Sequence, residues 1–316
     1  MVAVWVAVTV NFAIPRVMPG NAVQGMLAKF PQLSPSSLKA LEAEFGTGHA
    51  GGLLHQYFTY WGNLLSGNLG LSSSQYPSSV ASIINQTLPW TLILVGSATI
   101  ISFALGTLFG ALAAWRRDGW LDRALPAFTL LQATPYFFLA LVVIQLFALK
   151  WRLFPFGQGY ALGLTPGWSW SFISSAIYHS ILPAGTIVLT SIGGWMLQMR
   201  NVMLTTIGED YVLVAQAKGL APGRVVFSYA ARNAILPNIA GFALSLGFVV
   251  AGALVMEIVF SYPGIGLTLY NAVTSADYPL LQGIFLVISL AVLTAALIAD
   301  LIYVLADPRA RNRTAV

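Results

Sequence analysis

Five apolar stretches, each long enough to cross a lipid bilayer, constrain the fold of this 316-residue chain more than any other feature. A helix needs about 20 apolar residues to cross the hydrocarbon core of a bilayer. The sequence therefore predicts an all-α, polytopic membrane protein. The five stretches are Trp90–Trp115, Ala124–Leu149, Ile181–Met203, Asn238–Tyr262 and Gln282–Leu305.

Composition excludes several classes of protein. Only 8% of the residues are charged and 57% are apolar, whereas a soluble domain carries about 25% charged residues. The chain has no cysteine, so it can form no disulfide, thiolate metal site or cysteine nucleophile. Its net charge of +5 comes from residues scattered along loop ends, which fits membrane topology better than nucleic-acid binding.

A sixth apolar stretch, Val2–Ile14, is too short to cross a bilayer alone. It lacks the basic start and the small-residue cleavage site of a signal peptide. We interpret it as the outer part of a first span whose inner part is missing from the sequence. Six transmembrane helices are then expected.

Basic residues predict the orientation of the spans, because short cytoplasmic loops carry an excess of Lys and Arg. One set of loops holds ten basic residues and the opposite set holds five, so the first set and the C-terminus are expected in the cytoplasm. The ten are Arg116, Arg117, Arg123, Arg200, Lys218, Arg224, Arg232, Arg309, Arg311 and Arg313. The five are Arg16, Lys29, Lys39, Lys150 and Arg152.

The spans contain helix-disrupting residues that a bilayer tolerates. Pro126, Pro135 and Pro183 fall inside apolar stretches, where neighbouring helices can satisfy the freed backbone groups. The pair Gly106 and Gly110 lies on one helix face and predicts close packing against another helix.

An external segment, residues 15–89, is too polar to insert. Ser34 and Pro35 predict the start of a short helix that reaches Phe45. A second helix is expected over Leu53–Leu65, with Tyr57 and Trp61 on one face. It is either an amphipathic cap on the outer membrane surface or part of a docking surface for an external partner.

No catalytic or nucleotide-binding motif is present. The chain contains no G-x-x-x-x-G-K-[ST] loop and only three dispersed histidines, so it offers no phosphate-cradling loop and no convincing His-based metal site. We expect no cofactor in this chain. If transport is active, its energy comes from a partner chain or from an ion gradient.

Two ionisable residues fall inside predicted spans, Glu257 and Asp300. Such residues are typical of ion-coupled carriers, but both lie close to the predicted membrane boundaries. We expect Glu257 to hydrogen-bond the turn that follows it and Asp300 to fix an inner helix end. Together with Pro263, Gly264 and Gly266, they are the structural or pathway candidates.

Several motifs occur in a fixed order along the chain. They are Arg16–Gly20 (RVMPG), Gly67–Gly70 (GNLG), Leu88–Leu92 (LPWTL), Gly208–Tyr211 (GEDY), Ala215–Leu220 (AQAKGL), Arg232–Pro237 (RNAILP), Glu257–Gly266 (ExxFxxPGxG) and Asp307–Arg309 (DPR). In this order the chain resembles the inner-membrane permease subunits of the dipeptide, oligopeptide and nickel group of ABC importers over nearly its whole length. The resemblance divides it into a first helix (1–14), an extracytoplasmic segment (15–89) and a permease core (90–316), with a cytoplasmic coupling loop (204–237) and a cytoplasmic tail (306–316).

The resemblance implies a permease of the type I kind in the cell inner membrane. It implies a second homologous permease, two ABC ATPase subunits that bind ATP and Mg, an extracytoplasmic substrate-binding protein and contact with membrane lipid, but no nucleic acid. The region Ala215–Leu220 would be the coupling helix, since its small residues permit close approach of an ATPase. The residues expected to take part in coupling are Glu209, Asp210, Tyr211, Ala215, Ala217, Lys218, Gly219, Leu220 and Arg224.

The sequence leaves the substrate open, together with two other classes of function. Peptides, oligosaccharides and nickel are all associated with this family; the aromatic, uncharged loop Phe154–Tyr160 favours sugars modestly. An ion-coupled secondary transporter would need no ATPase, but inverted repeats are not evident. A membrane-embedded enzyme would need a catalytic constellation, and none is visible.

Overall fold

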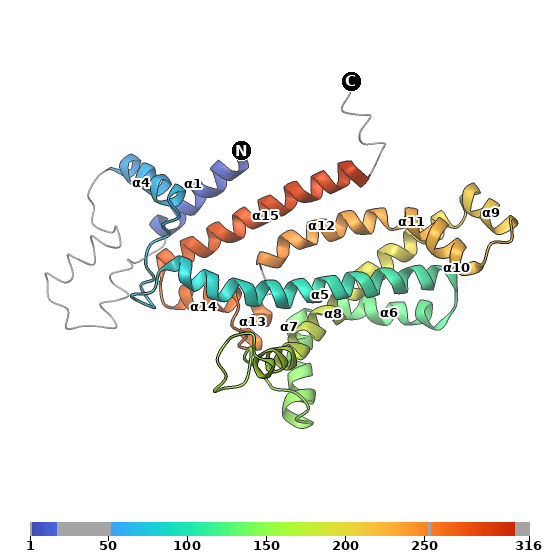
Figure 1. Cartoon of the computed structure of the whole chain (residues 1–316), viewed down its shortest axis with the longest axis horizontal. Coiled ribbons are helices and arrows are strands. Elements are labelled where there is room, and N and C mark those ends of the chain that lie inside the picture. Colours follow the sequence, from blue (N-terminus) through green and yellow to red (C-terminus); the bar gives the residue numbers. More distant parts are fainter. Residues whose placement is uncertain (1, 18–51, 252–253, 307–316) are drawn as a thin grey trace, which may run out of the picture. The chain divides into compact units, whose positions relative to one another are not determined.

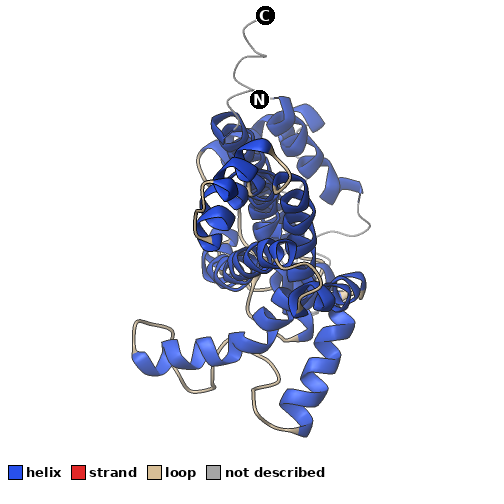
Figure 2. Ribbon diagram, turned by 90° about the vertical axis from the view of Figure 1, so that its right-hand side faces the viewer, coloured by secondary structure: helices blue, strands red, loops and turns tan. Residues whose placement is uncertain are grey.

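The computed structural model describes residues 2–17, 52–251 and 254–306. Throughout these ranges the chain forms helices and connecting loops, and its only β-pairing there is one isolated bridge between Leu71 and Ser79 (Figure 2). The predicted helix from Ser34 to Phe45 lies outside the described residues. The chain divides into two compact units, and we describe each by itself.

The first unit comprises residues 1–91, 250–258 and 263–293. Its labelled helices in Figure 1 are α1 (Val2–Val17), α4 (Leu53–Leu65), α13 (Leu254–Val259), α14 (Ile265–Thr274) and the first part of α15 (Tyr278–Ala306), together with the start of α5 (Val80–Trp115). The core joins α5, α14 and α15. Its buried side chains are Val80, Ile83, Ile84, Ile265, Ala272, Tyr278, Leu280, Leu281 and Ile284.

The second unit comprises residues 92–249, 259–262 and 294–316. After the rest of α5 it contains α6 (Trp120–Ala133), α7 (Tyr136–Val143) with the π-helix η1 (Ile144–Lys150), and α8 (Trp170–Thr206). A run of short helices follows: α9 (Asp210–Ala217), α10 (Pro222–Arg224), the π-helix η2 (Val225–Ala230) and α11 (Ala231–Ala234). Helix α12 (Leu236–Ala251) then runs to the end of this described range.

Glycines let α5 and α8 approach each other closely, as Gly106 and Gly110 predict from the sequence. A Cβ atom at Gly106 would lie 2.8 Å from the carbonyl oxygen of Ile192. At Gly110 it would lie 2.9 Å from the Cβ atom of Met199 and collide with the carbonyl oxygen of Met196. Gly193, also on α8, meets the backbone of Phe128 on α6 in the same way. Backbone-to-backbone packing of this kind stabilises helix association where no hydrophobic effect drives it.

Substituting Gly110 tests this contact. Gly110→Val is expected to lower the free energy of unfolding by about 1–3 kcal/mol, because the backbone of α8 cannot yield as a side chain can. Gly185→Val is the matched control, since a Cβ atom at Gly185 meets nothing within 4 Å. Thermal unfolding of both detergent-solubilised variants measures the difference. Equal melting temperatures would show that the Gly110 contact does not stabilise the fold.

The apolar stretch Ala124–Leu149 does not form one straight span. It divides into α6 and the α7–η1 helix, which are bent by 101° at the break. The cause is Pro135, which cannot donate a backbone hydrogen bond and holds Thr134 in an extended conformation with ψ of 130°. The bilayer tolerates prolines, but this one ends the helix.

The described residues contain three helices long and apolar enough to cross a membrane, namely Val80–Trp115, Trp170–Thr206 and Tyr278–Ile298. A fourth is present if the bent pair crosses as one broken span. Val2–Ile14 and Leu236–Val249 are shorter apolar helices. The structure thus confirms an all-α fold with several apolar helices, while the count of six spans stays a prediction.

Candidate functional site

The charged segment Glu209–Pro237 is folded rather than extended. Helix α9 begins after Glu209, the N-cap residue, whose backbone is extended, and it ends at Ala217. The predicted coupling residues therefore divide between a helix and the turn after it: Asp210 to Ala217 are helical, whereas Lys218, Gly219 and Leu220 form the turn.

The turn explains the spacing of AQAKGL. Gly219 has a φ of +72°, a left-handed conformation that glycine adopts without steric cost. Its N–H donates to the carbonyl of Gln216 at 2.9 Å, and the N–H of Leu220 donates to the carbonyl of Ala215 at 3.4 Å. These two bonds define a Schellman motif, which ends a helix with glycine and satisfies its last carbonyl groups.

One face of this segment is anchored in the core of the second unit. Val212, Ala215, Val225, Val226, Ala230 and Ala234 are buried and pack with Ala111 and Ala114 of α5 and with Met199 and Met203 of α8. A hydrogen bond from the side-chain amide of Asn233 to the hydroxyl of Tyr211, 2.9 Å long, joins α11 to α9. The segment is thus attached to the ends of two long helices through a continuous packed core.

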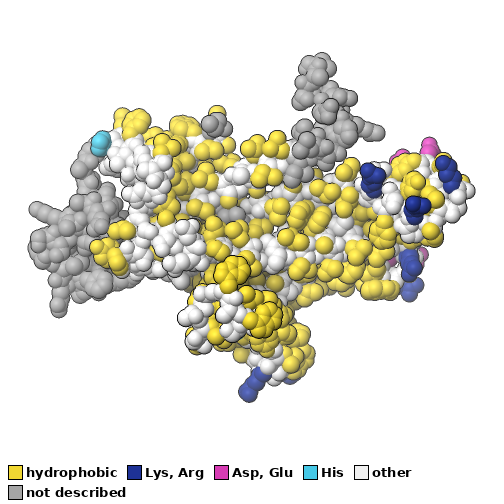
Figure 3. Space-filling model, viewed as in Figure 1, with side chains coloured by type: hydrophobic (Ala, Val, Ile, Leu, Met, Phe, Trp, Pro, Cys, Tyr) yellow, Lys and Arg dark blue, Asp and Glu magenta, His cyan; other side chains and the backbone are white. Residues whose placement is uncertain are grey.

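The opposite face is exposed and mixes apolar and charged side chains. Leu213, Val214 and Phe227 are each about half exposed, and Asp210, Lys218 and Arg224 are exposed beside them. Figure 3 shows Lys, Arg, Asp and Glu side chains gathered at the end of the view where Figure 1 places α9 and α10. Exposed apolar side chains together with charged ones are typical of a protein–protein contact surface.

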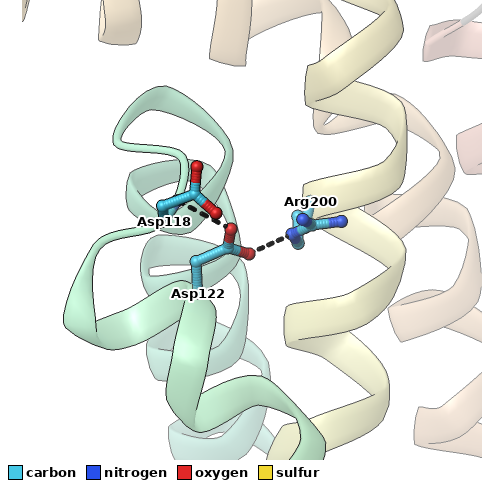
Figure 4. Close-up of polar contacts among 3 residues, drawn as sticks. All are labelled: Asp118, Asp122 and Arg200. Carbon is cyan, nitrogen blue, oxygen red and sulfur yellow. Dashed lines mark hydrogen bonds and ion pairs between the residues drawn. The ribbon is translucent and has the colours of Figure 1, made fainter.

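An ion pair joins two helices of the same unit. The Nε atom of Arg200 on α8 lies 2.5 Å from Oδ1 of Asp122 on α6, and the backbone N–H of Asp118 donates to Oδ2 of Asp122 (Figure 4). The Asp122 and Arg200 side chains are 11% and 24% exposed. Both oxygens of Asp122 therefore have a donor, which ties the start of α6 to α8.

Glu257 forms a separate polar site in the first unit. Its side chain is fully buried. The carboxylate accepts hydrogen bonds from the Thr91 hydroxyl at 2.7 Å, the Gly266 N–H at 2.6 Å and the Leu267 N–H at 3.2 Å. Thr91 in turn accepts from the N–H of Ile265 at 2.8 Å. As the sequence predicted, Glu257 bonds the segment that follows it.

The geometry explains the PGxG motif. Gly264 is the N-cap of α14 and has no side chain with which to cap it, so Glu257 supplies the acceptor for the first N–H groups of that helix. A Cβ atom on Gly264 would collide with the Glu257 carboxylate, and one on Gly266 would lie 2.9 Å from Oε2. Pro263 precedes this pair and is partly buried.

A second buried carboxylate, Asp277, was missed by the sequence reasoning. It is fully buried and accepts from the Leu280 N–H at 3.1 Å, so it is the N-cap of α15. Its other oxygen accepts from the hydroxyls of Ser72 and Ser74 and from the Ser74 N–H. The available signal was an Asp immediately before a long apolar run. Asp300 belongs to α15, but its side chain lies outside the described part of the structure.

None of these groups of residues has the composition of a metal site. Within the described ranges no three His, Asp or Glu side chains gather closely enough to hold an ion. Glu257 and Asp277 bind helix ends, and the exposed face of Glu209–Pro237 carries charged side chains.

Comparisons of the sequence with known proteins identify the family of this chain. Residues 106–312 match the model of the binding-protein-dependent transport system inner membrane component. The di/tripeptide transport system permease protein DppB of Pseudomonas aeruginosa (strain UCBPP-PA14) is 33% identical, over 96% of this chain and 93% of its own length. The dipeptide transport system permease protein DppB of Escherichia coli K12 is 32% identical over the same shares. The oligopeptide transport system permease protein AppB of Bacillus subtilis 168 is 29% identical, over 95% of this chain and 92% of its own length.

The family match covers most of the chain, including α8 to α15 and the whole charged segment, and the relatives align along nearly its full length. The chain is therefore a multi-pass inner-membrane protein, and it belongs to the family of inner-membrane permease subunits of binding-protein-dependent importers, in the group of the dipeptide and oligopeptide permeases.

Proposed function

We propose that this chain forms half of the translocation pathway of a peptide importer and is driven through the exposed face of Glu209–Pro237 by separate ABC ATPase subunits. The observation that carries the proposal is this face, with Leu213, Val214 and Phe227 exposed on an element whose other side is packed against α5 and α8. Displacement of a surface anchored in this way moves two long helices together. Rigid displacement of packed helices is a known mode of domain-scale switching.

The other partners follow from the family. A second homologous permease completes the pathway, an extracytoplasmic binding protein delivers the substrate, and the ATPase subunits bind ATP and Mg. In this arrangement the coupling loop and the C-terminal tail face the cytoplasm. The basic residues Lys218, Arg224 and Arg232 of this loop support this side, because short cytoplasmic loops are rich in Lys and Arg.

Peptides are the proposed substrate. Relatives that align over more than nine tenths of this chain are named for dipeptide, di/tripeptide and oligopeptide transport. The aromatic loop that favoured sugars has a structural role: the N–H of Gln158 donates to the carbonyl of Phe260 at 2.9 Å, and a Cβ atom on Gly157 would lie 2.6 Å from the same oxygen. This contact accounts for part of that loop without a sugar.

Reconstitution tests the proposal. The chain is co-expressed with the permease, ATPase and binding-protein genes that neighbour it, and the complex is placed in liposomes. ATP-dependent uptake of labelled di- and oligopeptides is expected, with none for oligosaccharides of similar size. Uptake that persists without the ATPase subunits but responds to a proton or sodium gradient would identify an ion-coupled carrier instead. ATP-driven uptake of oligosaccharides but not of peptides would contradict the proposed peptide substrate. It would still agree with the proposed coupling to ATPase subunits.

A further inference from the structure

Helix α4 of the extracytoplasmic segment exposes an apolar face and carries no charge. Its sequence, LLHQYFTYWGNLL, contains no Lys, Arg, Asp or Glu. Leu54, Phe58 and Leu65 are 75%, 68% and 81% exposed. They are four and seven residues apart and so share one face of the helix. A water-facing helix would be expected to place polar residues at such positions.

The opposite face of α4 packs on α1 and has its polar groups satisfied there. The ring of Tyr57 meets that of Phe12 at 5.1 Å in an edge-to-face contact, and its hydroxyl lies 2.8 Å from the Thr9 hydroxyl. The Tyr60 hydroxyl accepts from the side-chain amide of Asn11 at 3.1 Å. These two tyrosine hydroxyls thus bond within the protein, as a lipid environment requires because it supplies no hydrogen bonds, while Oδ1 of Asn11 is buried without a partner.

Arg16 marks the boundary with water on this side of α1. Its guanidinium donates to the carbonyl of Phe12 at 2.7 Å and to the side chain of Gln56 at 3.1 Å, and it lies over the Phe12 ring at 3.5 Å. The guanidinium thus folds back over the preceding turn of α1, whose other residues carry no charge. An arginine near the end of an apolar membrane helix is expected close to the interface, because a charge is costly deeper in the bilayer.

The contacts that α4 makes with Thr9 and Asn11 lie below that boundary. Thr9 and Asn11 precede Arg16 by seven and five residues, which is about 7–10 Å along a helix. Helices that lie in the interface bury their apolar face about 5–10 Å below the headgroups. The distance of the α4 contacts from Arg16 therefore agrees with the depth at which an interfacial helix lies.

The apolar surface also continues on α1 itself. Val2, Trp5, Val6 and Val10 are between 44% and 76% exposed, and α1 has no charged residue before Arg16. In a multi-pass membrane protein, exposed apolar side chains on such a helix face lipid. Helix α4 crosses α1 (Figure 1) and presents the same kind of surface.

We infer that α4 lies within the bilayer interface, in the leaflet on the Arg16 side, with Leu54, Phe58 and Leu65 in contact with lipid acyl chains. This inference needs only the membrane location of the chain and does not depend on the proposed substrate or on ATPase coupling. Of the two roles that the sequence allows for Leu53–Leu65, α4 is then an amphipathic cap on the outer membrane surface and not part of a docking surface for an external partner.

Site-directed spin labelling can test the position of α4, because the chain has no natural cysteine. Phe58→Cys and Leu65→Cys are labelled with a nitroxide in liposomes that contain no other protein. Ser78→Cys, an exposed loop position in the same unit, is the control. The collision rates of each label with oxygen, which concentrates in lipid, and with a water-soluble nickel chelate are measured.

Lipid contact predicts high oxygen and low nickel accessibility at Phe58 and Leu65, with the reverse at Ser78. High nickel accessibility at Phe58 would overturn the inference, and its loss on adding the extracytoplasmic binding protein would identify α4 as a protein-docking surface. Low accessibility to both reagents would also overturn it, because the helix would then be covered by protein. The test requires no transport, so its failure is distinct from failure of the proposed function.

Discussion

Removal of the Glu257 carboxylate is expected to destabilise the protein strongly. Glu257→Ala leaves the Gly266 N–H, the Leu267 N–H and the Thr91 hydroxyl without their acceptor in a buried site. Each buried group that loses its partner costs about 1–3 kcal/mol, so a loss of about 3 kcal/mol or more is expected. Thermal unfolding in detergent, together with the yield of membrane-inserted protein, measures it.

Two milder variants keep this prediction testable if Glu257→Ala does not fold. Glu257→Gln retains one acceptor oxygen for the α14 backbone and turns a donor toward Thr91, so it should fall between Ala and the natural residue. Thr91→Val removes the hydroxyl that accepts from Ile265 and should also destabilise, whereas Thr91→Ser should not.

The same variants separate helix capping from ion transfer. A capping carboxylate predicts that transport falls in proportion to the amount of folded protein. An ion relay predicts a stable Glu257→Gln protein that cannot transport. A Glu257→Gln variant with unchanged melting temperature and abolished uptake would therefore contradict the structural role.

The sequence predicted features that depend on local residue types and spacing. Apolar length located the long helices α5, α8 and α15, and Gly106 with Gly110 located a close helix contact that the structure confirms. Glu257 was expected to bond the turn after it, and it does. The helix lengths follow from the thickness of the bilayer. The bonding of Glu257 follows because a buried carboxylate needs hydrogen-bond donors.

The features that the sequence did not predict depend on contacts between distant residues. Asp277 lies just before an apolar run, but its partners Ser72 and Ser74 are about 200 residues away, so spacing along the chain could not pair them. The break at Pro135 was not expected, because a bilayer tolerates prolines inside spans. Whether a proline bends or ends a helix depends on whether neighbouring groups donate to the carbonyl that it leaves free in the preceding turn.

The coupling residues are proposed to bind a partner through their exposed side chains. Neither the spacing of residues along the chain nor the packing of the core determines which partner binds there. The fold does show how AQAKGL combines its small residues with its glycine: Ala215 faces the core, Ala217 is exposed, and Gly219 ends the helix. The motif therefore serves two functions, anchoring on one side and exposure on the other. A test of coupling must change the exposed side alone.

Gly219 offers such a test, and Gly219→Trp is expected to abolish uptake while the subunit still inserts and folds. A Cβ atom there meets nothing within 4 Å, so the indole would project from the exposed face, where the proposed ATPase contact requires close approach. Gly219→Ala is the matched control, because both variants force a side chain into the left-handed conformation at φ of +72°, at about 1–2 kcal/mol. Uptake and co-purification with the ATPase subunits should be largely retained with Ala and lost with Trp, at similar melting temperatures. Equal loss in both would assign the effect to the Schellman turn, and normal uptake with Trp would show that no partner binds closely at this turn.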